Sequence, residues 1–222
     1  MRGIINSKVI KDTKEDFRNA KPYPHVVIDN FFNANFLREV IRSFPHYEDN
    51  VWFRFRKNIG ELENIFEKGT SAISKPEDMP SLCKSFLNNL NSDEFCSILT
   101  TLTGIEGIRP DDHWHYSGLR VNIPGGTQLI HSDALFHPHL RKRKILTLMI
   151  YLTENWQKYQ EGCLEMWDND MTSCMKKIEP RFNRVCIFKN EEASYHGVTK
   201  NNHHRLAITM SYLLDESEET RR

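Results

Sequence analysis

Three residues have the types and the spacing of a metal site. His131 and Asp133 close the apolar run 128–130, which follows the turn residues 124–126. Side chains two apart in a β-strand point to the same face, so an imidazole nitrogen and a carboxylate oxygen can meet at one point in space. His196, far downstream, can supply a third ligand. Two histidines and a carboxylate that leave the opposite coordination positions open are a ligand set that suits iron(II).

An arginine beyond the third ligand indicates what else could bind there. Arg205 follows His196 by nine residues, with turn residues near 200–202 between them. If that turn joins two neighbouring strands, Arg205 lies close to the metal and presents a cationic fork suited to a carboxylate. Such a cation suits 2-oxoglutarate, whose keto acid chelates iron while its other carboxylate meets the arginine. The competing interpretation of Arg205 is a salt bridge at the rim of a sheet.

Other histidine pairs have similar spacing, so the motif alone is not specific. They are His113 with His115, His137 with His139, and His203 with His204. A histidine is more often a surface residue or a hydrogen-bonded core residue than a ligand. His137 precedes Pro138 in an expected loop, and the last pair follows the turn signal Asn201-Asn202, which predicts a hairpin tip. The first trio, with Arg205 after it, is the more specific combination.

The first half of the chain is predicted to be mainly helical. Residues 22–32 are expected to be extended, because each proline biases the residue before it away from helix and a β-branched run follows. The spacing of apolar residues predicts helices from Asn33 to Pro45, from about Glu77 to Leu90, and from Ser92 to Gly104. The alternating segment Val51 to Lys57 predicts a half-buried strand.

After Pro110 short strands replace the helices. Apolar runs separated by turn signals predict strands at 119–123, 127–131, 145–152, 163–167, 184–188, 194–198 and 205–213. Strands at this spacing, without intervening helices, favour antiparallel sheets closed as a sandwich or a jelly roll. The predicted fold class is α+β, with N-terminal helices buttressing a β core.

Composition narrows the class of protein. The 222 residues carry 30 basic and 30 acidic side chains, and this balance gives no reason to expect nucleic acid or an anionic membrane as a partner. Five scattered cysteines without a C-x-x-C pair indicate neither a disulfide framework nor a zinc knuckle, and they favour a reducing cytoplasm. No run reaches the length of a membrane span, and residues 1–21 are expected to be a polar, poorly packed lead-in.

Many short motifs of the sequence occur together in one family. They are Pro22-Tyr23-Pro24-His25, Ile28-Asp29-Asn30-Phe31, Leu102-Thr103-Gly104-Ile105, Gly118-Leu119, His131-Ser132-Asp133, Tyr151-Leu152-Thr153-Glu154-Asn155-Trp156, Gly162-Cys163-Leu164-Glu165-Met166-Trp167, Ile178-Glu179-Pro180-Arg181-Phe182-Asn183-Arg184, Tyr195-His196-Gly197-Val198 and Arg205-Leu206-Ala207-Ile208-Thr209. With these motifs, which span nearly the whole chain after residue 21, the sequence resembles the iron(II)- and 2-oxoglutarate-dependent oxygenases of the prolyl-hydroxylase-like group.

This resemblance implies roles for five residues. His131, Asp133 and His196 would hold iron(II), and Arg205 would bind the distal carboxylate of 2-oxoglutarate. Tyr151 looks like the phenol that helps to hold that carboxylate in some relatives. The implied enzyme is a dioxygenase that hydroxylates a substrate C–H bond with release of succinate and CO2; O2 is a co-substrate, and ascorbate is a further candidate.

The resemblance also implies a domain organisation. A single oxygenase domain would span residues 22–222, helical to about residue 110, with a double-stranded β-helix (jelly roll) core at about 111–214. Cys163 departs from the family pattern, in which relatives often carry a second glycine.

The substrate is left open by the sequence. Peptidyl proline, a free amino acid and a glycan precursor all fit, and the oligomeric state is not indicated. The basic stretch Arg141 to Lys144 is either a lid that reads an anionic substrate or, as charge runs more often are, a solvated loop. Two non-enzymatic interpretations compete with the oxygenase: a jelly roll that only binds a ligand, and a protein-interaction module that uses Trp52 to Lys57 with the basic stretch.

Overall fold

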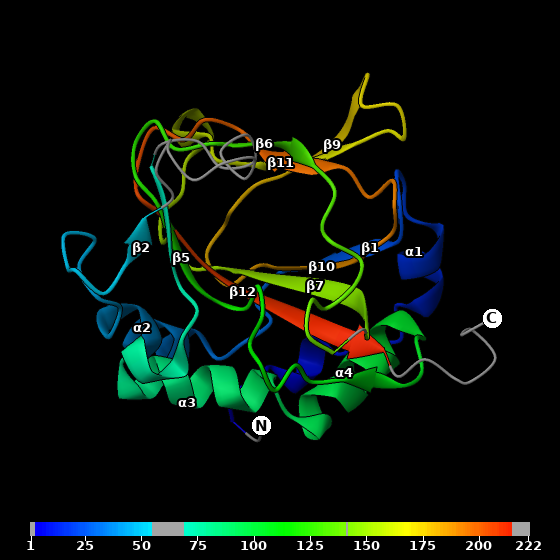
Figure 1. Cartoon of the computed structure of the whole chain (residues 1–222), viewed down its shortest axis with the longest axis horizontal. Helices are drawn as coiled ribbons and strands as arrows, with labels where there is room; N and C mark the ends of the chain where they lie inside the picture. Colours follow the sequence, from blue (N-terminus) through cyan, green and yellow to red (C-terminus); the bar gives the residue numbers. More distant parts are fainter. Residues whose placement is uncertain (1–2, 55–68, 141, 215–222) are drawn as a thin grey trace.

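Two antiparallel sheets face each other in the computed structural model, which describes residues 3–54, 69–140 and 142–214 (Figure 1). The large sheet has the order β1 (His25–Ile28), β10 (Val185–Lys189), β7 (Arg143–Tyr151), β12 (Arg205–Leu214), β5 (Gly118–Asn122), β3 (Thr70–Ile73) and β2 (Phe53–Arg54), with β4 (Ile108–Arg109) paired to β12. The small sheet has the order β6 (Gln128–His131), β11 (His196–Val198), β8 (Leu164–Trp167) and β9 (Cys174–Ile178). The predicted α+β fold with a jelly-roll core is confirmed.

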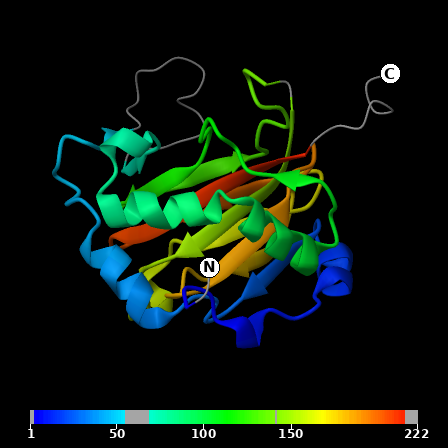
Figure 2. The ribbon, with the colours of Figure 1, turned by 90° about the horizontal axis from the view of Figure 1, so that it is seen from below.

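Four α-helices are described besides short 3-10 turns. They are α1 (Lys14–Asn19), α2 (Ala34–Arg42), α3 (Ser81–Leu90) and α4 (Asp93–Thr103). Helices α3 and α4 cross the face of the large sheet that lies away from the small sheet, as the view from below shows (Figure 2). The other face of the large sheet is therefore the one that looks toward the small sheet.

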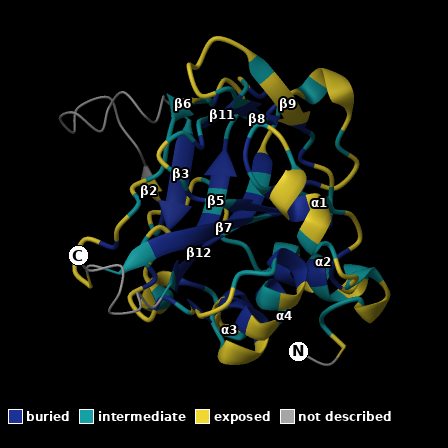
Figure 3. Cartoon of the chain, turned by 90° about the vertical axis from the view of Figure 1, so that its right-hand side faces the viewer, coloured by how far each residue is buried: buried dark blue, intermediate teal, exposed yellow. Residues whose placement is uncertain are grey.

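The central strands of the large sheet are buried on both faces (Figure 3). On β7, Leu146, Leu148 and Ile150 belong to the core shared with the helices, whereas Tyr151 belongs to a second cluster that includes Leu164 and Met166 of β8. Strands buried on both faces appear in the sequence as nearly continuous apolar runs rather than alternating ones. This explains why the β7 and β10 runs were easy to predict as strands.

The helix ends follow the capping chemistry of the sequence. The Asn33 side chain accepts hydrogen bonds from the backbone of Asn35 and Phe36, and Ser92 caps α4 through the amide of Phe95. Gly104 ends α4 with φ 74°, a left-handed conformation that glycine adopts without a steric penalty. The helices predicted after Asn33 and after Ser92 are confirmed.

One helix boundary and several strands differ from the prediction, β3 and β4 among the strands that were not predicted. The helix expected from Glu77 begins only at Ser81, because Pro80 holds the residue before it extended; a 3-10 turn, Pro76–Asp78, precedes it. Strand β9 was not predicted, since Cys174–Ile178 is mostly exposed and carries two lysines. Of the strand expected at Val51 to Lys57, Phe53–Arg54 is observed, and residues from 55 onward lie outside the described residues.

The expectation of a poorly packed lead-in is wrong for its described part. Phe17 on α1 is buried in the main core, and the amide of Asn33 donates to the carbonyl of Ile4 at 2.7 Å. Thr13 donates its hydroxyl to the carbonyl of Leu102 at the end of α4. The segment packs against the core through the apolar side chain of Phe17. The charged residues around Phe17 made the segment look polar in the sequence.

Candidate active site

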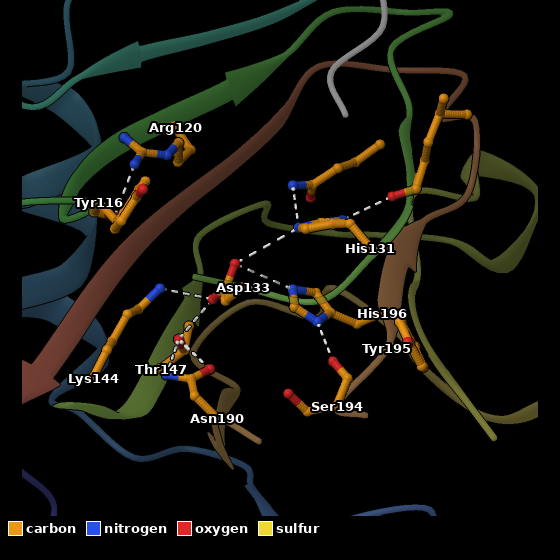
Figure 4. Close-up of polar contacts among 12 residues, drawn as sticks. Tyr116, Arg120, His131, Asp133, Lys144, Thr147, Asn190, Ser194, Tyr195 and His196 are labelled. Carbon is orange, nitrogen blue, oxygen red and sulfur yellow. Dashed lines mark hydrogen bonds and ion pairs between the residues drawn. The ribbon is translucent and has the colours of Figure 1, made fainter. Parts of the chain in front are cut away.

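The three predicted ligands meet where β6 and β11 pair. His196 lies opposite His131 in the β11–β6 register, and their ring centroids are 4.4 Å apart. The Nε2 atoms of His131 and His196 lie 3.7 and 3.9 Å from Oδ1 of Asp133 (Figure 4). Among the residues that the structure describes, this is the one set of three histidine, cysteine or acidic side chains whose ligand atoms lie within 4.8 Å of one another.

Both imidazoles are oriented by backbone carbonyls. The Nδ1 atom of His131 lies 2.8 Å from the carbonyl of Leu129, and Nδ1 of His196 lies 2.9 Å from that of Ser194. A carbonyl oxygen only accepts, so Nδ1 carries the proton and the Nε2 lone pair faces Asp133. The Gln128 amide nitrogen lies 3.3 Å from Nε2 of His131, on the lone pair that a metal would take. This donor set fits iron(II).

The Asp133 carboxylate presents different oxygens to two sides. Oδ1 faces the imidazoles, while Oδ2 accepts from Lys144 Nζ at 2.8 Å and from the Thr147 hydroxyl at 3.2 Å. Burial raises the pKa of the Asp133 carboxyl, but the Lys144 ammonium beside Oδ2 outweighs it and holds that pKa well below its usual range. Burial lowers the pKa of His196 to about 4. Both groups are therefore in the protonation state that metal binding requires.

Arg205 lies on β12 of the large sheet, and some nitrogens of its guanidinium make no hydrogen bond to the described residues. The side chain is 2% exposed, its Nη1 donates to Oδ1 of Asn122 at 3.2 Å, and its guanidinium carbon lies 5.2 Å from the centroid of the Tyr151 ring. Nε and Nη2 of Arg205 and the Tyr151 hydroxyl are buried with no hydrogen-bond partner among the described residues. Buried donors without acceptors are costly, so a ligand with acceptor oxygens fits this corner.

The interpretation of Arg205 as a rim salt bridge is wrong. Within residues 3–54, 69–140 and 142–214 it has no carboxylate partner, and it is fully buried. Gly162 is part of the reason that it fits, because a Cβ there would lie 3.0 Å from Arg205 Cδ. Asn122 also holds Thr70 through its Nδ2 at 2.8 Å. Sequence reasoning missed Asn122, whose signal was a polar residue inside the buried run of β5.

The predicted route by which Arg205 approaches the ligands is also wrong. β11 and β12 follow each other in the chain but pair with different strands, β11 with β6 and β8, and β12 with β7, β4 and β5. The expected hairpin tip at His203 and His204 is instead a crossing between the sheets, which Asn201 pins by donating to the carbonyl of Ile123. One cavity is nevertheless lined by Asp133, His196 and Arg205, from both sheets.

Four of the competing histidines, His113, His115, His137 and His139, cluster outside the proposed metal site. The ring centroid of His137 lies 5.4 Å from that of His113, 5.1 Å from that of His115 and 5.8 Å from that of His139. His137 is buried in the loop after Asp133, and its Nδ1 accepts from the amides of His139 and Leu140. The hydrogen-bonded core role expected for such a histidine accounts for it.

The basic stretch is only partly the solvated loop that was favoured. Lys144 is 3% exposed and paired with Asp133 inside the cavity; Arg141 lies outside the described residues. Trp52 is likewise buried and donates its indole N–H to the carbonyl of His46. Trp52 and Lys144 are therefore too buried to belong to an interaction surface. Lys144 instead places a cation in the cavity, which its position in a charge run did not indicate.

Fold and site together define a class: a jelly roll in which two histidines and a carboxylate converge beside a cavity between the two sheets. Residues 118–212, which run from β5 into β12, match the family model described as the 2OG-Fe(II) oxygenase superfamily. Comparison with curated protein sequences gave no significant match. This matched region holds His131, Asp133, His196 and Arg205, so the part of the chain that carries the candidate site is similar to the 2OG-Fe(II) oxygenase superfamily.

Solved structures share the fold. A Pseudomonas putida prolyl-4-hydroxylase matches with a TM-score of 0.66 and 17% identity, over 92% of this chain and 98% of that one. A Trichoplax adhaerens prolyl hydroxylase, solved with a peptide fragment of the hypoxia inducible factor oxygen degradation domain, matches with a TM-score of 0.68 and 20% identity, over 96% and 92%. A Burkholderia pseudomallei oxidoreductase of the 2OG-Fe(II) oxygenase family matches with a TM-score of 0.59 and 13% identity, over 94% and 92%.

Proposed function

We propose that this cavity hydroxylates a C–H bond of a peptide or a small molecule, with His131, Asp133 and His196 holding the iron. The observation that carries the proposal is that one cavity is lined by Asp133 and His196 of the ligand trio and, from the other sheet, by a buried arginine fork that has no carboxylate partner among the described residues. Iron(II) bound there with 2-oxoglutarate and O2 would supply the oxidising chemistry, and the products would be succinate, CO2 and the hydroxylated substrate.

At the metal end the protein fixes the ligands. The two carbonyls that accept from Nδ1 set the imidazole tautomers, and Lys144 with Thr147 holds Oδ2 of Asp133 so that Oδ1 remains for the metal. The ligands are thus held in place before the metal enters, and the Gln128 amide is the neighbour that would have to leave Nε2 of His131. Lys144 is therefore a positioning residue for Asp133.

At the other end Arg205 and Tyr151 would receive the distal carboxylate of 2-oxoglutarate. Nε and Nη2 lie on one edge of the guanidinium and can take both oxygens of a carboxylate, and the Tyr151 hydroxyl offers a further donor. Burial raises the pKa of Tyr151, so its hydroxyl keeps the proton that it would donate. The burial of Arg205 also keeps water away from this contact.

The test is conversion of 2-oxoglutarate to succinate by purified protein with iron(II) under air, measured by mass spectrometry. Turnover that disappears in His131→Ala but persists in His113→Ala, which removes an exposed histidine outside the trio, supports the proposal. Equal turnover in both variants would contradict it. A gain of one oxygen atom in a peptide or metabolite screen would then identify the substrate.

We propose a single domain over residues 22–222 and a cytoplasmic location. The single domain is supported by β1 and β3, which come from the first half of the chain and pair within the large sheet. The location is supported by five cysteines that are free thiols. No helix in the described ranges is long and apolar enough to span a bilayer. Limited proteolysis and cell fractionation test the two statements.

A further inference from the structure

A second arginine faces the same cavity. Arg120 lies on β5, two residues from Asn122, so the two side chains share the face that looks into the cavity. In the close-up its guanidinium lies beside Tyr116, across from Asp133 (Figure 4). The side chain is half-buried, and it lines the cavity together with Lys144 and Arg205.

Neutral acceptors hold Arg120 in place, and the described carboxylate that acts on its charge, Asp133, forms no ion pair with it. Nη1 donates to the Ser74 hydroxyl at 3.3 Å and to the carbonyl of Leu119 at 3.1 Å, and Nη2 donates to the carbonyl of Tyr116 at 2.9 Å. A guanidinium has five N–H groups, so these contacts leave Nε–H and one Nη2–H for another acceptor. No carboxylate of the described residues pairs with it, and burial lowers its pKa to about 10, which still leaves it charged.

The other two cations of the cavity already have assigned partners. Lys144 is paired with Asp133 at 2.8 Å, and Arg205 is assigned to 2-oxoglutarate. Asp133 is the one acidic side chain among the described residues that line the cavity. Arg120 is therefore the cation that remains when metal and 2-oxoglutarate are both accounted for.

An aromatic ring lies beside this cation. Tyr116 is 44% exposed, and its ring lies 4.6 Å from Nζ of Lys144. A fixed guanidinium next to an accessible aromatic face offers one site for a negative group and one for an apolar body. The corner formed by Arg120 and Tyr116 thus has the composition of a binding site for a carboxylate attached to a small apolar group.

We propose that Arg120 binds a carboxylate of the substrate and that Tyr116 packs on the adjoining part, so the oxygenase selects carboxylate-bearing substrates. This inference rests on the proposed function, because it assigns Arg205 to 2-oxoglutarate. The carboxylate can belong to a free amino acid or to an acidic side chain of a peptide. The alternative is that Arg120 only ties Ser74 to the turn at Tyr116.

Acetate and its neutral isostere acetamide test the site directly. Protein labelled with ¹⁵N is loaded with zinc and N-oxalylglycine, an unreactive isostere of 2-oxoglutarate, so that the metal and Arg205 are occupied. The Arg120 Nε–H resonance is identified by its loss in Arg120→Lys. Acetate should shift it saturably and acetamide should not; no shift with acetate, or an equal shift with acetamide, overturns the inference.

Variants then separate this site from the metal site. With acetate binding followed through the backbone amide resonances of β5, which all variants keep, Arg120→Gln should weaken it about tenfold, the size of one charge-assisted contact, with partial rescue in Arg120→Lys. Failure of the protein to bind N-oxalylglycine at all would instead count against the proposed function. In turnover, stimulation of succinate formation by free L-amino acids or by peptides with Asp or Glu identifies the source of the carboxylate. Stimulation by amides alone overturns the inference.

Discussion

Asp133 and Arg205 are charged side chains of one cavity, but of the two only Asp133 has a counter-charge among the described residues. Oδ2 of Asp133 accepts from Lys144, whereas Arg205 is buried with two nitrogens of its fork unpaired among the described residues. A buried charge without a partner is unfavourable. In the proposed function the metal end would therefore be complete in the folded chain, whereas the arginine end would be completed by the carboxylate of 2-oxoglutarate.

Removal of the metal ligands should have the largest effect. His131→Ala and Asp133→Ala should each abolish iron-dependent succinate formation, because two remaining ligands hold the metal poorly. Only Asp133→Ala leaves the buried Lys144 unpaired, so its free energy of unfolding should fall by about 3 kcal/mol more than that of His131→Ala. Urea unfolding measures this difference, and equal losses would mean that the ion pair does not stabilise the fold.

Loss of the Arg205 guanidinium should weaken the binding of 2-oxoglutarate and leave the metal site unchanged. Arg205→Ala should raise the 2-oxoglutarate KM by roughly one to two orders of magnitude, the effect of removing a buried charge from a carboxylate. Because Arg205 has no carboxylate partner among the described residues, removal of its buried charge should offset the loss of its hydrogen bond to Asn122, and the variant should lose little stability. An unchanged KM would mean that another cation, such as Arg120, binds the co-substrate.

The partner of Asp133 should affect the metal. Lys144→Met keeps the length of the side chain and removes the charge, and it should weaken manganese binding by about 10- to 100-fold, as is typical for outer partners of metal ligands. Isothermal titration calorimetry with Mn²⁺ measures this. Lys142→Met, on a neighbouring lysine outside the cavity lining, is the matched control and should bind manganese as the wild type does.

The smallest effect is expected at the phenol. Tyr151→Phe removes one buried hydroxyl that has no partner in the described part of the chain, so the 2-oxoglutarate KM should rise about two- to tenfold. The variant should unfold at the same urea concentration or slightly above it. An unaltered KM would remove Tyr151 from the binding site and leave the distal carboxylate to Arg205.

The sequence could predict site residues that lie close together in the chain, but not the partners that come from other strands. His131 and Asp133 were predictable because they lie two residues apart at and just beyond the end of one strand, where the local backbone sets the direction of side chains. The partners of Asp133 and Arg205 come from other strands: Lys144 appeared as one member of a charge run, and Asn122 as a polar residue in a strand. Pairing between strands depends on topology, which spacing along the chain does not encode.

The position of Arg205 illustrates this limit. A turn between His196 and Arg205 was predicted to make a hairpin, yet β11 and β12 belong to different sheets. The two side chains line one cavity because the sheets face each other. The residues were predicted correctly as neighbours of one cavity, but for a reason that the fold contradicts.

The most direct test of the account is a crystal structure of the protein with Mn²⁺ and N-oxalylglycine, with anomalous data at the manganese edge. We expect one manganese peak, bonded to Nε2 of His131, Oδ1 of Asp133 and Nε2 of His196. The distal carboxylate of N-oxalylglycine should lie on Nε and Nη2 of Arg205. A peak among the histidines around His137, or a carboxylate held by Arg120 in place of Arg205, would contradict it.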